Sequence, residues 1–194
     1  MAKAEIGKVK LRNVRLAFCN LFVAKSFNDD SSLPPKYSAS FLMSKTTPEG
    51  KANIAAVKAA MKAAYDEKWP KDGPKLKSNQ VCLRDGDDES YDGFEGMMYV
   101  SANNGKRPQI VDRDPSVPII EADDKVYSGC IVNATLRIWA QDSDWGKRLN
   151  CSVEAVQFVA AGERVGAKAV VPEEEFEVIA DDGGASGGEE ESPF

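Results

Sequence analysis

The chain has 194 residues, of which 42% are hydrophobic, and this is enough for one domain with a single core. It contains no histidine, which excludes Ser-His and Cys-His catalysis and every histidine-containing metal site. Its four cysteines lie far apart and lack the spacing of a zinc or redox motif, so we expect buried, reduced thiols. No signal peptide and no membrane-spanning apolar run is evident. We therefore expect a cytoplasmic protein, not an enzyme, with no cofactor, no metal and no membrane contact.

Charge is distributed unevenly along the chain. Residues 173–194 contain nine acidic side chains and no Lys or Arg, and a run of this kind is expected to be disordered because it repels itself. Residues 1–172 hold all 25 basic residues and 22 of the 31 acidic ones, a net charge of +3, although the whole chain carries −6. We therefore predict a folded domain over residues 1–172 and a disordered acidic tail over residues 173–194.

The tip of this tail combines an aromatic side chain with carboxylates. A terminal Phe after a Pro offers an apolar anchor, a free carboxylate and steering charge, which suits a small basic-rimmed pocket on a partner protein. A tail that only aids solubility is the alternative. The residues expected to bind a partner are Glu189, Glu190, Glu191, Pro193 and Phe194.

Two strands are predicted at the start of the chain. Residues 8–18 alternate apolar with basic side chains, and the phase of this alternation shifts near Asn13, which is typical of a β-bulge or bend. Residues 37–43 form a second strand after a loop-like segment. Each strand then has one face for a core and one for solvent.

A long amphipathic helix follows these strands. Thr47 offers a hydroxyl cap, Pro48 suits the first turn, and apolar residues recur at helical spacing until Pro70. We assign Tyr65 and Trp69 to packing of this helix on the sheet. A role of the helix in a homodimer interface stays open.

Shorter strands are predicted in the second half of the chain. After a mostly irregular segment, residues 97–102 and 108–112 are expected to form a hairpin around an Asn-Gly turn. A strand at residues 129–141 and a last strand at residues 149–159 complete the order. The count is about six strands and one helix.

The strand at residues 129–141 has an unusual outer face. Its even positions are small or apolar and suit a core, whereas Arg137 and Trp139 share the other face. Exposing this pair without a ligand is costly, and a base stacked on Trp139 with a phosphate near Arg137 would explain it. The alternative is that the helix or a loop covers this face.

Together these elements predict a mainly β fold with one long helix, an OB-fold-like small β-barrel followed by a disordered acidic C-terminal tail. A mildly basic barrel with exposed rings suits sequence-tolerant binding of single-stranded DNA. The residues expected to contact DNA are Lys36, Tyr37, Arg84, Tyr99, Lys106, Arg107, Arg137, Trp139, Trp145, Lys147 and Arg148.

Five short motifs resemble, in order and spacing, a phage family of OB-fold single-stranded DNA-binding proteins. They lie at residues 35–41, 83–87, 106–108, 126–130 and 155–158. The tip of the tail is also similar to the C-terminal tips of bacterial and phage single-stranded DNA-binding proteins. The resemblance covers residues 8–160 and implies phage DNA replication or recombination, non-specific single-strand binding and no enzymatic activity. A helix after the second strand departs from the usual OB order.

In the hypothesis that we favour, the acidic tail competes with DNA for the groove and, once displaced, recruits a replication or recombination protein. A second hypothesis is a non-enzymatic protein-interaction module, an adaptor or inhibitor of host replication proteins that docks through its tail. A third is a metal-dependent nuclease that uses Asp85, Asp87 and Asp88. The spacing of these carboxylates misses the EF-hand pattern, so a solvated turn is the simpler interpretation.

Overall fold

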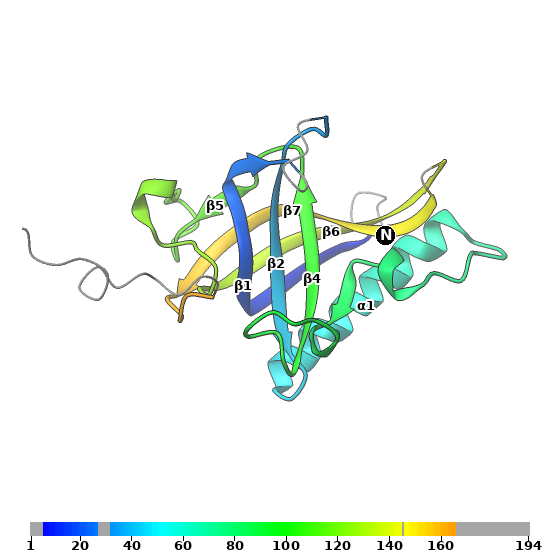
Figure 1. The fold of residues 1–194 in the computed structure, drawn as a ribbon, viewed down its shortest axis with the longest axis horizontal. Helices are drawn as coiled ribbons and strands as arrows, with labels where there is room; N and C mark the ends of the chain where they lie inside the picture. The colour runs from blue at the N-terminus through cyan, green and yellow to red at the C-terminus, as the bar shows by residue number, and fades with distance from the viewer. Residues whose placement is uncertain (1–5, 27–31, 145, 166–194) are drawn as a thin grey trace, which may run out of the picture.

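Long antiparallel strands and one α-helix make up most of the structure, a computed structural model that describes residues 6–26, 32–144 and 146–165 (Figure 1). Trp145 and the acidic residues 173–194 lie outside the described residues, so the fold does not test the predictions made for them. Within the described ranges, no helix is long and apolar enough to cross a membrane.

The first strand, β1 (Lys8–Lys25), bends and pairs with two different neighbours (Figure 1). Its first part pairs antiparallel with β6 (Ile131–Ser143), and its later part pairs antiparallel with β2 (Lys36–Ser44). Where the register with β6 shifts, Asn13 has a φ of 49°. The predicted bulge is therefore confirmed, and the bend that it causes lets β1 pair with strands on two sides of the barrel.

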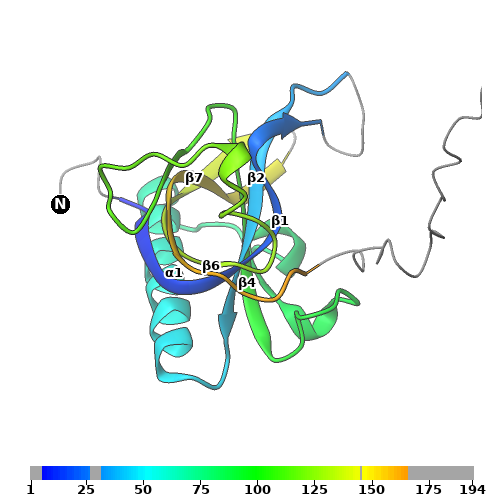
Figure 2. The same ribbon diagram turned by 90° about the vertical axis from the view of Figure 1, so that its left-hand side faces the viewer.

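The other strands extend this sheet on both sides. They are β3 (Leu83–Asp85), β4 (Met97–Asn104), β5 (Gln109–Val111) and β7 (Gly146–Ala160). The order is β3-β4-β2-β1-β6-β7-β5, and all neighbours are antiparallel except β5 and β7. Figure 2 shows the sheet curving round on itself. Val81, just before β3, bridges to Leu149 of β7 and helps to close the barrel.

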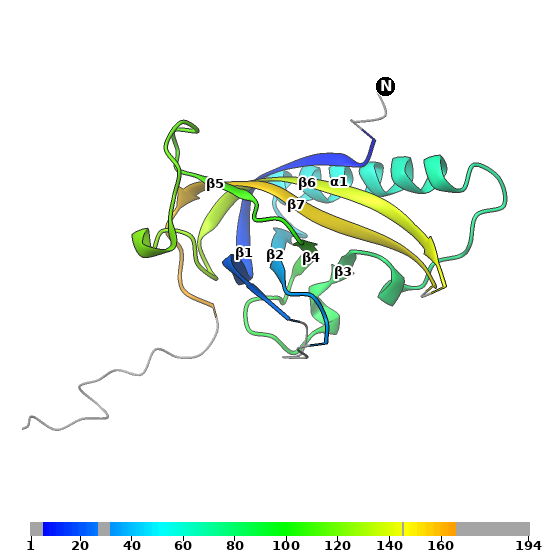
Figure 3. The same ribbon diagram turned by 90° about the horizontal axis from the view of Figure 1, so that it is seen from above.

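The helix, α1 (Pro48–Lys68), follows β2 and precedes β3 in the chain, so its predicted place after the second strand is confirmed. Thr47 caps it by accepting a hydrogen bond from the amide of Gly50 at 3.2 Å. A Cβ atom on Gly50 would lie 2.1 Å from the carbonyl oxygen of Ser44, so only glycine lets the helix start this close to β2. Figure 3 shows α1 running beside one end of the barrel.

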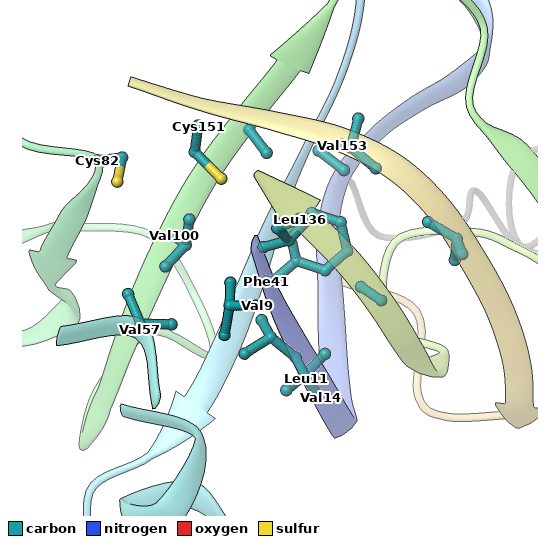
Figure 4. Packing of buried hydrophobic residues seen from close by; sticks show 14 of the residues in the cluster. Val9, Leu11, Val14, Phe41, Val57, Cys82, Val100, Leu136, Cys151 and Val153 are labelled. Carbon is teal, nitrogen blue, oxygen red and sulfur yellow. The ribbon is translucent and has the colours of Figure 1, made fainter. Parts of the chain in front are cut away.

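The core fills the barrel and continues under the helix. The alternation predicted for β6 is confirmed, because Leu136 and Ile138 are fully buried. Val57 of α1 is also fully buried, and Figure 4 shows it beside the side chains of the barrel core. Trp69 is buried in the core cluster with Tyr65 packed against it, which confirms that both residues pack the helix on the sheet, and their rings meet edge to face with centroids 5.1 Å apart.

The four cysteines are free thiols, as predicted. Cys82, Cys130 and Cys151 are buried, and Cys19 is half-buried. Burial raises the pKa of the Cys19 thiol to about 11, which favours its neutral form.

The hairpin predicted between residues 97–102 and 108–112 is wrong. β5 does not pair with β4; instead Gln109 lies opposite Ala155 of β7 in a parallel register. The side chain of Asn104 donates a hydrogen bond to the Val153 carbonyl at 2.9 Å, which ties the end of β4 to β7. Ile110 is buried at this point. Burial of an apolar strand therefore overrides the local Asn-Gly turn signal.

Candidate nucleic-acid interface

Small and polar side chains occupy part of the outer surface of β2, β4 and β1, whereas Leu42 and Tyr99 on the rest of it pack with Phe94 of the loop at residues 86–96. Cross-strand register places two rows next to each other on this surface, since their neighbours in sequence, such as Phe41 and Val100, point into the core. We call these residues the β2–β4 face: Ser40 and Ser101 in one row, and Asn20, Ser38 and Asn103 in the next. Ser40 and Ser101 are linked through their hydroxyl oxygens, 3.3 Å apart. Ser40 is buried, Asn20, Ser38 and Ser101 are half-buried, and Asn103 is exposed.

Basic residues border the β2–β4 face on two sides. One border is the end of the face where β2 begins and β4 ends. Lys36 begins β2, two residues before Ser38, and Lys106 and Arg107 lie in the turn that follows β4. The guanidinium of Arg107 lies 5.5 Å from the ring centroid of Phe22, which holds it in place. All three cations are exposed.

A second border consists of β3, alongside β4, and the tip of the hairpin between β6 and β7. Arg84 of β3 pairs with a residue of β4 and points to the same side as the face. Gln80 donates a hydrogen bond to the carbonyl of Lys147 at 3.2 Å, so Lys147 and Arg148 lie next to the segment that precedes β3. Among the described residues, Lys36, Arg84, Lys106 and Arg148 form no ion pair, whereas Lys147 lies 3.6 Å from Asp142.

Tyr99 does not offer its ring to a ligand, although an exposed ring was expected there. The side chain is buried, and its ring packs edge to face on Phe94, with centroids 5.0 Å apart. Its hydroxyl donates a hydrogen bond to Glu89 at 2.5 Å. Burial and then this hydrogen bond raise the pKa of Tyr99 to about 12, against the opposing effect of Arg84. The loop at residues 86–96 folds over β4 and covers the tyrosine.

Two exposed rings that the sequence did not single out lie on the same loop and on β1. Phe18 is 48% exposed and Tyr91 is 51% exposed. Their ring centroids are 5.0 Å apart and the ring planes are at 78°. Both rings rest on buried Phe94. The only sequence signal was the pair of aromatic residues in the Gly-rich run 86–96.

Trp139 and Arg137 lie on a different part of the barrel wall, beyond β7. Trp139 points outward, as predicted, is 43% exposed and donates a hydrogen bond to the Ser152 hydroxyl at 3.1 Å. Arg137 is half-buried and donates to the Glu154 carboxylate at 2.6 Å, so this cation already has a protein partner. Asn150, two residues after the predicted contact Arg148, lies opposite Trp139. The last predicted residue, Tyr37, is half-buried at the start of β2.

The carboxylates considered as metal ligands are engaged with a lysine. Asp85 and Asp87 both accept hydrogen bonds from the Lys45 ammonium group, at 2.6 Å for Asp87. These bonds are the main cause of the lowered pKa of both carboxyl groups. Within the ranges that the structure describes, no group of three or more His, Cys, Asp or Glu side chains is placed to hold a metal ion.

The fold and this surface define a class of protein. β1 pairs with both β2 and β6, and β1, β2, β4, β6 and β7 take the places of the five strands of an OB barrel. OB barrels bind oligonucleotides or oligosaccharides on the face of their second and third strands and on the adjoining loops. Here these strands are β2 and β4, the strands of the polar face described above.

Comparison with known proteins identifies the family. A sequence profile of the family described as Enterobacter phage Enc34, ssDNA-binding protein, matches residues 7–186, and the chain belongs to this family. A protein of Acyrthosiphon pisum secondary endosymbiont phage 1, named putative protein p50, is 39% identical over 177 residues, which cover 88% of this chain and 92% of that protein.

Solved structures agree with this assignment. The single-stranded DNA-binding protein from bacteriophage Enc34 in complex with ssDNA superposes with a TM-score of 0.72 and 25% identity, over 82% of this chain and 90% of that chain. The T7 protein gp2.5, a single-stranded DNA-binding protein, superposes with a TM-score of 0.51 and 11% identity, over 92% of this chain and all of that chain. At this identity the T7 protein supports only the shared fold.

Proposed function

We propose that the chain is a sequence-non-specific single-stranded DNA-binding protein that serves phage DNA replication or recombination in the cytoplasm of the host cell. The observation that supports this most directly is the position of the cations. Six predicted basic residues border the face of β2 and β4, where OB barrels bind oligonucleotides. The family assignment and the likeness to the Enc34 complex support the same conclusion.

In the proposed mechanism, basic side chains bind the phosphates, and the β2–β4 face and Trp139 bind the bases. Phosphates contact the cations at the two borders, which makes binding strong at low salt and independent of sequence. The bases lie on the β2–β4 face, where short side chains offer little that distinguishes one base from another. A strand that continues past Arg148 crosses β7 next to Asn150 and reaches Trp139, which stacks a further base.

The acidic tail is proposed to compete with DNA for this surface. The described chain ends at Val165, whose amide donates to the carbonyl of Ser128 at 2.9 Å. A Cβ atom on Gly93 would lie 3.8 Å from the side chain of Val165, so this end reaches the loop at residues 86–96. The first acidic residue of the tail follows only eight positions later, which gives the tail a high effective concentration at the DNA site.

DNA that enters the groove then displaces the tail, and residues 189–194 become free to bind a replication or recombination protein. The carboxylates steer this encounter and Phe194 supplies the apolar anchor.

Titration of tryptophan fluorescence with oligo-dT at two salt concentrations tests the proposal. We expect quenching that weakens with salt and that decreases in Trp139→Ala; quenching that remains in this variant is assigned to Trp145, because Trp69 is buried. Quenching that is unchanged in Trp139→Ala would keep the function and remove Trp139 from the path. An absence of binding at low salt would contradict the proposed function and would favour the protein-interaction module instead.

A further inference from the structure

Three basic side chains of β1 lie on a different side of the barrel from the β2–β4 face. Val9 and Leu11 point into the core, so Lys8, Lys10 and Arg12, which alternate with them, point outward. Cross-strand register places these cations beside the outward side chains of β6. We call this surface the β1–β6 wall, and it consists of Lys8, Lys10, Arg12, Asn133, Thr135 and Arg137.

The fold itself does not require the cations of the wall. Charged side chains often protect an exposed strand edge, but β1 has a neighbour on both sides at Arg12. β6 pairs along one side, and on the other the Asn53 side chain of α1 accepts from the Arg12 amide at 3.2 Å and donates to the Arg12 carbonyl at 2.8 Å. Lys8 lies directly opposite Arg137, and like charges placed in this way lower stability. Among the described residues, Lys10 and Arg12 form no ion pair. Such a cluster indicates a ligand with negative charge.

The surroundings of the cations favour a protein ligand over a further stretch of DNA. A groove of about 250 Å³ runs beside Lys10 and Arg12, and short side chains such as Thr135 line it. Single-strand sites combine cations with aromatic rings, but none of the described residues that line this groove is aromatic. Glu154, which pairs with Arg137 at 2.6 Å, adds a negative charge to the wall. A protein segment can place its few carboxylates away from Glu154, whereas a DNA strand carries a phosphate at every nucleotide.

The same chain carries a complementary acidic surface. The loop at residues 86–96 holds five carboxylates and no Lys or Arg. Two of these carboxylates accept hydrogen bonds from other side chains. The remaining three, Asp88, Asp92 and Glu95, are exposed and form no ion pair within the part of the chain that the structure describes. Opposite charge on two surfaces steers and orients their association.

The wall and the acidic loop lie on different sides of the barrel, so a contact between them joins two copies. Figure 3 shows the first part of β1 on one side and β3, which leads into the loop, on the other. We propose that the β1–β6 wall of one copy binds the loop at residues 86–96 of a second copy, with Lys10 and Arg12 beside Asp92 and Glu95. Each pair keeps one free wall and one free loop, so further copies can add head to tail.

This contact makes neighbouring copies bind a long single strand cooperatively. Cooperativity of this kind rests on the proposed function, whereas the contact itself does not. Copies that follow one another along a strand are held at high effective concentration, so a contact of a few exposed charges is strong enough to act there.

The test uses charge reversal in the full chain. Lys10→Glu with Arg12→Glu makes the wall acidic, and Asp92→Lys with Glu95→Lys makes the loop basic. Affinity is measured for a long dT strand and for a short one that holds a single copy, and the ratio of the two affinities reports cooperativity. Each double variant should lower this ratio about tenfold, because attraction between exposed charges becomes repulsion. A chain with all four substitutions should recover the ratio of the unmodified chain.

The matched control is Lys71→Glu with Lys75→Glu, which changes the net charge by the same amount at exposed positions outside the wall. The wall variant and this control should bind the short strand equally well and differ only in the ratio. Thermal melting of each variant checks that the barrel is intact.

The outcomes separate this inference from the proposed function. If the unmodified chain fails to bind dT, the proposed function is wrong, and sedimentation velocity of the unmodified chain and the wall variant at low salt still tests the contact. A lack of cooperativity in the unmodified chain, or an equal ratio in the wall variant and the control, would overturn the inference. Weaker binding of the short strand by the wall variant than by the control would assign the wall to DNA. A ratio that falls as far on deletion of residues 173–194 would assign the wall to the acidic tail. Either of these last two results would also overturn the inference.

Discussion

Salt dependence offers the sharpest test of the cations that border the β2–β4 face. On a single strand, each phosphate that a cation neutralises contributes about 0.7 to the slope of log affinity against log salt concentration. Six bordering cations that all contact phosphate correspond to a slope of about −4, or a loss of affinity of about 300-fold between roughly 50 and 200 mM salt. This slope is large enough to be measured one residue at a time.

Lys36→Gln removes one of these charges at an exposed position. The slope should become less steep by about 0.7, and affinity at 0.1 M salt should fall about fivefold. The matched control is Lys62→Gln on α1, where the lysine is 75% exposed and pairs with Asp66. Fluorescence anisotropy of labelled oligo-dT over a series of salt concentrations measures both slopes. The reasoning would be refuted if both variants kept the slope of the unmodified chain, or if they reduced it equally.

Three further predictions concern the tail, the helix and the acidic loop. Deletion of residues 173–194 should tighten binding of oligo-dT, most strongly at low salt; equal or weaker binding by the folded truncation would contradict competition by the tail. Asn53→Leu should lower the free energy of unfolding in urea by about 2 kcal/mol or more, because buried Asn53 both accepts from the amide and donates to the carbonyl of Arg12; the exposed control Lys51→Leu should change it by less than about 0.5 kcal/mol. Lys45→Met should destabilise the protein at neutral pH. The pKa values of Asp85 and Asp87 are lowered in the folded protein, so the stabilisation that Lys45 provides is present above about pH 4 and is lost as the pH falls through these lowered values. A stability difference between the variant and the unmodified chain that persists in acid would contradict this prediction.

Local sequence signals predicted the elements that depend on local physics. The cap and first turn at Thr47 and Pro48 define where the helix begins, and period-two alternation defined the core face of β6. The phase shift near Asn13 located the bulge in β1. Each of these features depends on backbone geometry and burial within one element, and the sequence of that element carries both.

Features that depend on distant contacts could not be predicted in this way. Tyr99 looked like an outward ring on β4, but the loop at residues 86–96 folds back and buries it. The Asn-Gly turn predicted that β5 pairs with β4, but β5 pairs with β7, where Ile110 is buried. Phe18 read as the end of an alternating strand, and only a second register shift turned it outward. The basic residues were predicted one by one, whereas their arrangement around one face came from barrel closure.

The central claim is that single-stranded DNA lies across the outer surface of β2 and β4. An amide-resolved NMR titration with oligo-dT tests it most directly. We expect the largest shifts at Ser38, Ser40 and Ser101, with little change at Lys58 on the exposed side of α1. Saturable binding with shifts confined to other parts of the barrel, and none at these three serines, would contradict the account.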